Sequence, residues 1–328
     1  MSIRIALDAL GGDRAPGVPV QGAFLAAKEG VEVLLVGEEA RLRAELARLG
    51  TSLPIHHAPD WIPMEEHATE VRKRRESSIM VAMDLLKRGE VQAVVSMGHT
   101  GATMAAALFT LGRVKGVERP ALLVEFPSQR GRTFLLDGGA NADCRPFFLV
   151  QFAAMGLAYA EASGLKDPKV GLLSIGEEEG KGNALVLETY PLLKDALGER
   201  FFGNVEGRDV FLGTAEVVVT DGFTGNVVLK LAEGEAKVLL GWIKEALTSS
   251  PLAQLGALLA RGALRKVKEK VDPSQYGAMP LLGVEGAVFI GHGSADALAV
   301  KNALLRARSL VAAGLLDRVR AGLSALHV

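Results

Sequence analysis

The chain has 328 residues, of which 49% are hydrophobic and 5% aromatic, so its core is built from Ala, Leu, Val and Gly. This length allows one large or two medium domains, and the composition suits an α/β protein with small residues at helix–sheet contacts. The 37 basic and 38 acidic residues give a formal net charge of -1, which argues against a general nucleic-acid-binding protein.

A single cysteine, Cys144, excludes a disulfide within the chain and fits a reducing cytosol. The N-terminal residues MSIRIALDALGG lack the charged region and the long apolar region of a signal peptide. No apolar run approaches the ~18 residues of a membrane-spanning helix. We therefore expect a cytoplasmic protein, with peripheral attachment to a membrane as an open alternative.

Short runs of apolar and β-branched residues alternate with helical stretches along the chain. The first are IRIALD, a helical stretch at 17–29, VEVLLVG and a charged helix at 38–49. The alternation continues through VQAVVS, ALLVEF, RTFLLD, KVGLLSIG, AEVVVTDG and GAVFIGHG. This order predicts a three-layer α/β fold, with a largely parallel sheet covered by helices on both faces.

Residues 232–272 are the best candidate for a separate element within an otherwise single catalytic unit, residues 1–328, which could have two lobes. Their helical periodicity is broken once, at TSSP, residues 248–251. Proline is tolerated at the start of a helix and disfavoured inside one, so the break marks a turn between two helices. The segment is therefore predicted to be a helical hairpin that projects from the body.

Glycine-rich polar loops follow six of the predicted strands. In chain order they are DALGGDRAP, SMGHTGA, DGGANADCRP, SIGEEEGKGN, DGFTGN and GHGSAD. Glycine lets the backbone approach a ligand closely, and N–H groups at a helix start attract anions. Each loop alone is ordinary turn chemistry. Because ligands of open α/β sheets lie beyond the carboxyl ends of the strands, we expect the six loops to meet at one edge and bind a small anion.

Several other chemistries are disfavoured. The sequence has no Walker-type phosphate loop, no complete dinucleotide fingerprint and no G-x-S-x-G nucleophile elbow. Its six histidines lack metal-ligand spacing, so we expect no metal and no cofactor. The carboxylates of GEEEG are interpreted as a solvated turn. Cys144 lies at a predicted helix start, where its pKa could be lowered, although a lone cysteine is more often structural.

Taken in order, the loops resemble those of the bacterial phosphate acyltransferases. The resemblance is carried by DALGGDRAP, by RKRRESSIMVAMDLLKRGEVQAVVSMGHTGA, LLDGGANADCRP and GEEEGKGN, and by VVVTDGFTGNVVLK and YGAMPLLGVEGAVFIGHGSADALAVKNAL. These segments extend from residue 8 almost to the end of the chain. The family usually has Asn where this chain has His99, and often Met where it has Leu10.

The resemblance implies transfer of a fatty acyl group from acyl–acyl-carrier protein to inorganic phosphate. It also implies a homodimer with the isocitrate/isopropylmalate dehydrogenase-like fold, which phosphotransacetylases share. The acyl phosphate would feed phospholipid synthesis through a membrane glycerol-3-phosphate acyltransferase.

The catalytic residues are inferred from the chemistry of that reaction. Phosphate arrives already ionised, and a thiol with a pKa of about 8.5 leaves without strong acid assistance. The protein must therefore supply a phosphate cradle, alignment of the substrates and a donor to the oxyanion. For the cradle we expect the N–H and hydroxyl groups of Ser96, Gly98, His99, Thr100 and Gly101. For charge and for hydrogen bonds to the carbonyl we expect Lys181, Asn183 and Asn141.

The remaining candidates lie in the same set of loops. His292 and Ser294 are expected to close the site, with His292 among the catalytic groups. The other substrate-binding candidates are Asp8, Gly12, Asp13, Asp221, Thr224 and Asn226, of which the last three are expected to order the loop beside Asn141.

Two basic segments are expected to meet partners. Arg72, Lys73, Arg74 and Arg75 precede a serine-capped helix and could dock the acidic carrier protein, or form an ordinary solvated face. In the segment 250–270, Leu252, Leu255 and Leu259 share one face of a helical wheel, with Arg261 and Arg265 opposite. Such a helix can lie on an anionic membrane, or its leucines can pack in a dimer.

Two alternatives stay open at this stage. One is a phosphate acetyl- or butyryltransferase that uses coenzyme A thioesters. The other is a non-catalytic scaffold that recruits lipid enzymes to the membrane, which would have no need for an anion-binding pocket.

Overall fold

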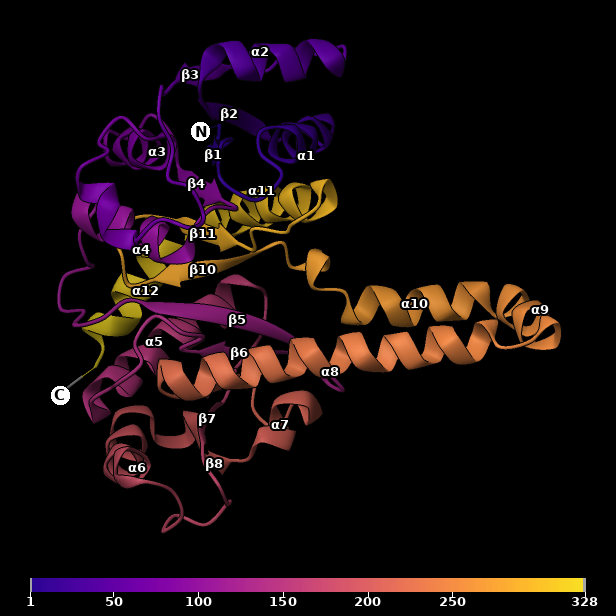
Figure 1. Cartoon of the computed structure of the whole chain (residues 1–328). Coiled ribbons are helices and arrows are strands. Elements are labelled where there is room, and N and C mark those ends of the chain that lie inside the picture. The colour runs from indigo at the N-terminus through magenta and orange to yellow at the C-terminus, as the bar shows by residue number, and fades with distance from the viewer. Residues whose placement is uncertain (1, 327–328) are drawn as a thin grey trace.

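A computed structural model describes residues 2–326 and contains one mixed eleven-stranded sheet, in the order β3-β2-β1-β4-β11-β10-β5-β6-β9-β7-β8 (Figure 1). The strands in chain order are β1 (Arg4–Asp8), β2 (Glu32–Gly37), β3 (Ile55–His57), β4 (Ala93–Ser96), β5 (Ala121–Ser128), β6 (Gly131–Leu136), β7 (Val170–Leu173), β8 (Phe201–Val205), β9 (Val217–Val219), β10 (Ala278–Leu282) and β11 (Val288–Gly291).

Helices connect these strands in the alternating manner that the sequence predicts. The α-helices are α1 (Gly17–Lys28), α2 (Glu39–Arg48), α3 (Ser78–Lys87), α4 (Thr100–Thr110), α5 (Pro146–Ala162), α6 (Ala184–Leu197), α7 (Gly207–Leu212), α8 (Gly222–Thr248), α9 (Pro251–Leu259), α10 (Arg261–Val271), α11 (Ala297–Ala312) and α12 (Leu315–Ser324). Short 3-10 turns form η1 (Ala68–Arg72), η2 (Gly198–Arg200) and η3 (Pro273–Gln275).

The helices cover both faces of the sheet, as the composition and the alternation predict. Ile5 and Leu7 of β1 pack in one apolar cluster with residues of α1, α5 and α11, whereas Ala6 packs in another with α3 and α4. Side chains that alternate along a strand point to opposite faces. A third cluster places α7 and α8 on the same side as α3 and α4, over β5, β6 and β9. The α/β class with two helical layers is confirmed.

The sheet changes direction in its middle. Within the described chain, the pairs β11–β10, β10–β5 and β5–β6 are antiparallel and the other neighbouring pairs are parallel. Strands β1–β5 and β11 therefore run one way and β6–β10 the other. The loops after β1, β4 and β11 leave one edge of the sheet, and those after β6, β7 and β9 leave the opposite edge. The expectation of six loops on one edge is wrong.

The reason for this reversal lies in a short connection. Only Gln129 and Arg130 separate β5 from β6. A two-residue link can join antiparallel strands, whereas parallel neighbours need a crossover of a dozen or more residues. The hairpin turns the second half of the sheet around, and every later strand of that half follows the new direction.

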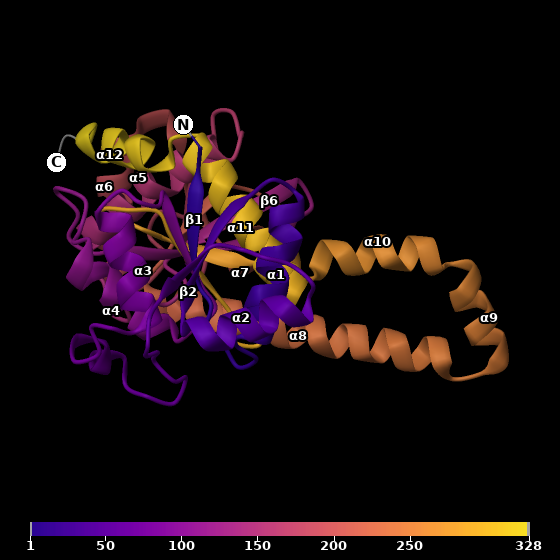
Figure 2. The same cartoon turned by 90° about the horizontal axis from the view of Figure 1, so that it is seen from above.

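Helices α8, α9 and α10 project from the body as an arm (Figures 1 and 2). The first break of this arm falls at Ser249 and Ser250, inside the predicted TSSP turn. A second break at Ala260 separates α9 from α10, so the expectation of a single break is wrong. Gly256 and Gly262 flank Ala260, and glycine is a weak helix former, which accounts for the extra break. Among residues 2–326, no helix is both long and apolar enough to cross a membrane.

Candidate functional site

A cleft of about 610 Å³ lies between α4 and α8. Its floor comes from β10 and β5, which pair with each other at only two positions, Leu281 with Leu122 and Leu282 with Ala121. Beyond these pairs the two strands separate, and the cleft extends between them as far as Tyr159 of α5. The cleft thus forms where the two oppositely directed halves of the sheet join.

Loops from both edges of the sheet reach this cleft. From the first edge come residues of the loops after β1, β4 and β11: Asp13, Gly98, Thr100, Gly101, His292 and Gly293. From the opposite edge come residues of the loops after β6 and β9: Gly138, Gly139, Ala140 and Asn226. Five of the six loops therefore contribute residues to one cleft, although they leave opposite edges of the sheet. The loop after β1 contributes through Asp13.

The first-edge loops hold one another closely. The N–H of Asp13 donates to the carbonyl of Gly293 at 2.9 Å. Gly12 has a φ of 105°, and a Cβ there would lie 3.1 Å from the carbonyl oxygen of Met97. This backbone conformation and this close approach both require glycine. Gly12 therefore allows the β1 and β4 loops to pack together and is not itself in the cleft wall.

Asp8 and Ser96 lie beneath these loops. The buried Asp8 carboxylate accepts hydrogen bonds from the hydroxyls of Ser78 at 2.6 Å and Ser96 at 2.8 Å. Ser96 Oγ in turn accepts the N–H of Gly98 at 3.0 Å. Burial raises the pKa of the Asp8 carboxyl, while the two hydroxyls act to lower it. This network fixes the position of Gly98, and both side chains are separated from the cleft that they support.

The N-terminus of α4 faces the cleft. His99 is its N-cap, and its Nδ1 accepts the N–H of Ala102 at 3.1 Å. The first N–H groups of a helix have no acceptor within the helix, and those of Thr100 and Gly101 lie in the cleft wall. Their partial positive charge favours an anion at this point. Capping also gives His99 a structural role that asparagine can fill as well.

The loop after β6 is organised around a buried carboxylate. Asp137 accepts backbone N–H bonds at 2.7–3.1 Å and one from the Asn141 amide at 2.8 Å; the backbone donors are Leu122, Gly139, Ala140 and Asn141. Burial raises the pKa of Asp137, and these donors act to lower it. Asn141 gives its amide N–H to the carbonyl of Pro120 as well, at 2.8 Å. The donor groups of this loop are thus already occupied by Asp137 and Pro120.

The start of α8 brings one polar side chain into the cleft. Asp221 is the N-cap, and it accepts both the N–H and the hydroxyl of Thr224 at 2.8 Å. Asn226 follows one turn later, lines the cleft and donates to the carbonyl of Gly138 at 3.3 Å. Asp221 and Thr224 therefore order the loop that positions Asn226.

The loop after β7 holds Lys181 and Asn183, which are both exposed. Asn183 is the N-cap of α6 and accepts the N–H of Val186 at 3.0 Å, and Ser174 Oγ donates to the carbonyl of Lys181 at 3.0 Å. Among the described residues that line the cleft, neither Lys181 nor Asn183 is present. Their catalytic roles remain predictions.

At the closing side, His292 lines the cleft, and its Nδ1 lies 2.8 Å from the hydroxyl of Ser294. Ser294 also gives its backbone N–H to the same nitrogen at 3.2 Å. Both side chains are exposed. Ser294 therefore holds the ring of His292 in place at the mouth of the cleft.

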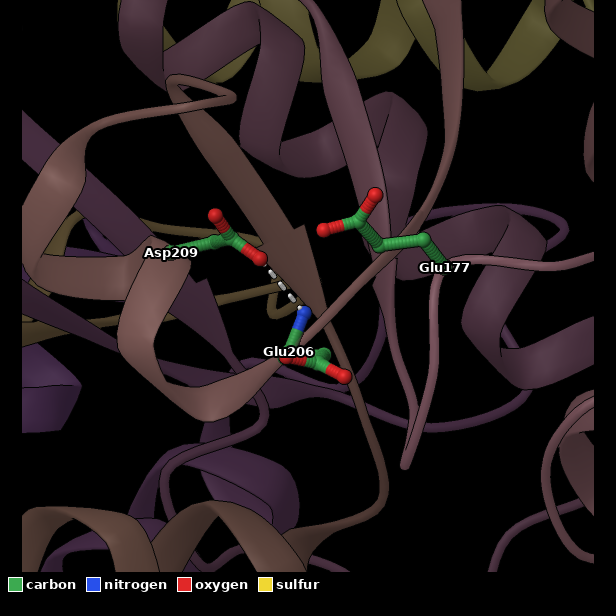
Figure 3. Close-up of side chains that lie close together, drawn as sticks. All are labelled: Glu177, Glu206 and Asp209. Carbon is green, nitrogen blue, oxygen red and sulfur yellow. Dashed lines mark hydrogen bonds between the residues drawn. The ribbon is translucent and has the colours of Figure 1, made fainter.

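Three carboxylates lie close together away from the cleft: Glu177, Glu206 and Asp209 (Figure 3). Asp209 accepts the N–H of Glu206 at 2.8 Å, which caps α7, and it also accepts the hydroxyl of Thr214. Arg208 lies 3.1 Å from Glu177 and 2.8 Å from Glu206. Two of these carboxylates therefore cap α7, and Arg208 lies between Glu177 and Glu206.

Cys144 is half-buried, and its Sγ donates to the carbonyl of Asn141 at 3.7 Å. The pKa of this thiol is raised to about 12, mainly by burial and in addition by the nearby Asp137, Asp221 and Asp143. The lowered pKa that the helix start made possible is not found, because desolvation and acidic neighbours outweigh any effect of the helix start, and this agrees with a structural cysteine.

The four cations of the basic segment before α3 make different contacts. Arg74 is half-buried and lies 3.2 Å from Asp60 and 2.7 Å from Glu66. Lys73 pairs with Glu70, and Arg72 stacks on the ring of Phe109 with its guanidinium 4.1 Å from the centroid. Arg75 is exposed, with no ion pair among the residues that the structure describes.

The predicted serine cap of α3 takes a different form. Ser77 occupies the N-cap position and makes no capping bond through its side chain. Ser78 directs its hydroxyl to Asp8 instead. The beginning of α3, directly after the basic segment, is therefore tied to the core beneath the β4 loop.

The arm exposes the leucines that the sequence singles out. In α9, Leu252 and Leu259 are 80% and 82% exposed, and Leu255 is exposed as well. Because Ala260 ends α9, Arg261 and Arg265 belong to α10, and the prediction of one continuous wheel over 250–270 is wrong. An apolar groove of about 670 Å³ lies between the three helices and is lined by residues such as Leu240, Ile243, Leu258, Leu264 and Val267.

Sequence reasoning missed the side chains that give the cleft its character. Its lining includes the apolar Met64, Met104, Met279 and Leu229, together with Tyr276 and the buried Glu125 and Tyr159. Glu125 could have been predicted, because a charged residue inside the apolar run ALLVEF is stable in a core only when it is paired with an opposite charge. The methionines had none, since apolar residues in helices and strands ordinarily indicate core.

Comparisons with known proteins agree on the class of protein. A family model described as "Fatty acid synthesis protein" matches residues 3–318. A phosphate acyltransferase of Thermus thermophilus is 81% identical over 99% of this chain and 100% of its own length. A phosphate acyltransferase of Elusimicrobium minutum is 51% identical over 97% of this chain and 95% of its own.

Solved structures show the same fold at low identity. A phosphotransacetylase from Streptococcus pyogenes has a TM-score of 0.64 at 17% identity, covering 95% of this chain and 94% of its own. A 4-hydroxythreonine-4-phosphate dehydrogenase from Klebsiella pneumoniae has a TM-score of 0.58 at 13% identity, covering 94% and 99%. The expected fold, shared with phosphotransacetylases, is confirmed.

Proposed function

The chain belongs to the phosphate acyltransferase family of fatty acid synthesis proteins, and from this premise we propose that the cleft between α4 and α8 is its active site. We infer that the donor is a fatty acyl–acyl-carrier protein and the product a fatty acyl phosphate. The observation that carries the proposal is that the first residues of α4 line the same cleft as apolar side chains such as Met104, Met279 and Leu229. One ligand is then an anion and the other carries a hydrocarbon.

In this mechanism inorganic phosphate binds at the start of α4. The N–H groups of Thr100 and Gly101 and the Thr100 hydroxyl donate to its oxygens, while Gly98 lets it approach the backbone. At neutral pH phosphate is already ionised, so no general base is required. One of its oxygens attacks the thioester carbonyl, and the thiolate leaves as the tetrahedral intermediate collapses.

Donors to the oxyanion are expected on the opposite wall. Asn226 lies in that wall at the start of α8, and His292 lies at the mouth of the cleft. Alignment of the two substrates and oxyanion donation each contribute several kcal/mol to such reactions. Lys181 and Asn183 enter this proposal as residues of a loop that closes over bound substrate, and Asn141 as support for the Gly138–Ala140 segment.

The direct test is formation of acyl phosphate. The protein is incubated with palmitoyl-carrier protein and radiolabelled phosphate, and the mixed anhydride is trapped with hydroxylamine. Thr100→Val should raise the KM for phosphate by about tenfold, since one charge-assisted hydrogen bond is lost. Absence of trapped product with the wild-type chain would reject the function, and an unchanged phosphate KM in Thr100→Val would reject the cradle.

Coenzyme A thioesters are the competing donors. The fold is shared with phosphotransacetylases, but a likeness at 17% identity extends to the fold alone. Comparing kcat/KM for palmitoyl-carrier protein and palmitoyl-coenzyme A decides between the donors. A non-catalytic scaffold predicts no turnover with either of them.

Two protein partners follow from this role. The acidic carrier protein would dock on the basic segment Arg72–Arg75. Arg75 is exposed there and has no ion pair among the described residues. A membrane glycerol-3-phosphate acyltransferase would consume the acyl phosphate, since a mixed anhydride in water is lost unless a second enzyme takes it up.

The arm is proposed to make the remaining contacts. The groove between α8, α9 and α10 is apolar and open, and a second copy of the chain would fill it in a homodimer. The exposed leucines of α9 at the far end would then meet an anionic membrane surface. Sedimentation of the pure protein tests the dimer, and co-sedimentation with anionic vesicles tests the membrane contact.

A further inference from the structure

Apolar side chains of an adaptable kind line the cleft. Three of the eight methionines of the chain are among them, Met64, Met104 and Met279, each half-buried. Leu229 of α8 and Val124 of β5 line the cleft as well, and Met279 packs in one apolar cluster with both. Methionine has a flexible thioether side chain that conforms to ligands of varying shape. A site for phosphate alone has no use for such a surface.

Polar groups line the same cleft. Thr100 at the start of α4 is one of them, and Asn226, which binds the Gly138 carbonyl, is another. Glu125 is a third; it is ion-paired to Arg306 and lies 3.3 Å from Arg132. The cleft therefore combines apolar side chains with the helix end that can bind an anion.

We propose that this patch, called the methionine patch and formed by Met64, Met104, Met279, Leu229 and Val124, binds the hydrocarbon chain of the acyl donor and sets the accepted chain length. The inference rests on the proposed function, because it assumes that a fatty acyl thioester is the donor. The cleft volume of about 610 Å³ is within the roughly 300–1,000 Å³ of sites for small organic ligands. Each methylene withdrawn from water there favours binding by about fourfold.

An apolar groove of similar size, about 670 Å³, lies in the arm. It begins at Leu240, seven residues beyond Glu233, the last α8 residue of the cleft, which is roughly 10 Å along the helix. Lys230 and Glu233 of the cleft wall form an ion pair of 2.8 Å on the stretch of α8 that precedes Leu240. A chain whose carbonyl lies at α4 would have to pass these charges to reach the groove, so the methionine patch is the better site.

The test compares donors of different length on variants that narrow or widen the patch. Carrier-protein thioesters of 6, 10 and 16 carbons are assayed for acyl phosphate, and the readout is the ratio of kcat/KM between long and short donors. Leu229→Trp should lower the ratio for the 16-carbon over the 6-carbon donor by at least about tenfold, because a pocket discriminates by roughly that factor per missing or extra methylene. The matched control is Leu231→Trp, two residues further along α8 and 68% exposed.

Met104→Ala is expected to act in the opposite direction. It removes bulk from the patch and should raise the same ratio severalfold. Because one variant adds atoms and the other removes them, a folding defect cannot produce both shifts. Retained turnover of the 6-carbon donor shows that each variant is folded.

Three results would overturn the proposal. Ratios unchanged within twofold in both variants place the chain elsewhere, and a shift in Leu258→Trp alone places it in the groove of the arm. A loss that is equal for all donors assigns Leu229 to the reaction centre and not to the chain. None of these resembles failure of the proposed function itself, in which the wild-type protein makes no acyl phosphate from any donor.

Discussion

At the scale of single residues, two buried carboxylates shape the candidate site although neither lines the cleft. Asp8 joins the hydroxyls of Ser78 and Ser96 beneath the β4 loop, and Asp137 gathers the N–H groups of the loop after β6. Buried polar groups of this kind are costly unless every partner is in place. Both loops are therefore held by their own aspartate, and the N–H groups left for a ligand are those at the start of α4.

Asp8 should give the folding stability a specific pH dependence. Its pKa is raised in the folded state by burial, so the contribution of the neutral form is fully present below the ordinary value of 3.8 and is lost as the pH rises through the raised value. Asp8→Asn should cost about 1–3 kcal/mol at low pH through weakened hydroxyl bonds, and less as the pH rises.

Urea unfolding at a series of pH values from about 4 to 7 measures this difference in the free energy of unfolding. Asp13→Asn serves as the control, because Asp13 is an exposed carboxylate in the same loop. A difference between wild type and Asp8→Asn that grows with rising pH would contradict the raised pKa.

Cys144 should be an unreactive thiol. With a pKa of about 12, its thiolate fraction near pH 8 is very small, so alkylation by iodoacetamide should be roughly a hundredfold slower than for the same cysteine in the unfolded chain. Cys144→Ser should keep the acyltransferase activity within about twofold. Fast alkylation of the folded protein together with loss of activity would show that the thiol takes part in the reaction.

At the scale of elements, the basic segment before α3 contains residues with different roles: Arg74 is bonded to the body of the protein, whereas Arg75 is exposed. Arg74→Ala should lower the free energy of unfolding by about 1–2 kcal/mol, because it removes the bonds to Asp60, Glu66 and the carbonyl of Trp61. Thermal or urea unfolding measures this loss. The KM for a small acyl thioester should not change.

Arg75→Glu should have the opposite profile. Stability should change by less than about 0.5 kcal/mol, since the side chain is exposed and has no ion pair in residues 2–326. The KM for the carrier-protein donor should rise several-fold at low salt, and the difference should fade as salt is added. Steady-state kinetics with carrier-linked and small donors gives both values, and equal effects on the two donors would exclude docking at this segment.

The elements were predictable to different degrees. The alternation of apolar runs gives the strands and the two helical layers, and TSSP gives the turn at Ser249 and Ser250. The break at Ala260 has a weak signal in the glycines on either side of it. The reversal of the sheet has a strong signal, the two residues Gln129 and Arg130 between β5 and β6, which a chain-wide pattern of alternation conceals.

The sequence predicts the loops that line the candidate site, but it does not predict how they come together into one cleft. The glycine loops mark the backbone that reaches the cleft, and Gly98, Thr100 and Gly101 are among the residues that line it. The cleft itself arises because Leu281 pairs with Leu122 and the strands then part. That pairing joins residues far apart in the sequence, and no local pattern encodes where two strands stop pairing.

At the scale of the whole molecule, the two halves of the sheet are joined across a short seam. Beside the two residue pairs of β10 and β5, Arg306 of α11 crosses to Glu125 of β5 and donates to the hydroxyl of Tyr159 at 2.8 Å. Glu125 is 4% exposed at its side chain. The seam is therefore held by a buried ion pair as well as by backbone bonds.

Breaking that pair should destabilise the protein strongly. Arg306→Met leaves the Glu125 carboxylate buried with Arg132 at 3.3 Å, and the loss of one partner of a buried pair costs about 3–5 kcal/mol. The double variant Glu125→Leu with Arg306→Met should recover much of this loss, because no buried charge is left behind and the remaining cation, Arg132, is 39% exposed at its side chain. Urea unfolding of the single and double variants measures both, and equal losses in the two would show that packing of the arginine matters more than its charge.

The arm is attached to the cleft at both of its ends. α8 leaves from the wall that carries Asn226 and Leu229, and the chain comes back from α10 through η3 into β10, which carries Met279 on the floor. With its 27 residues α8 is about 40 Å long, so the tip of the arm lies far from the cleft to which both of its ends are joined. Any contact that holds the tip would therefore act on the α8 wall and on the β10 floor of the cleft together.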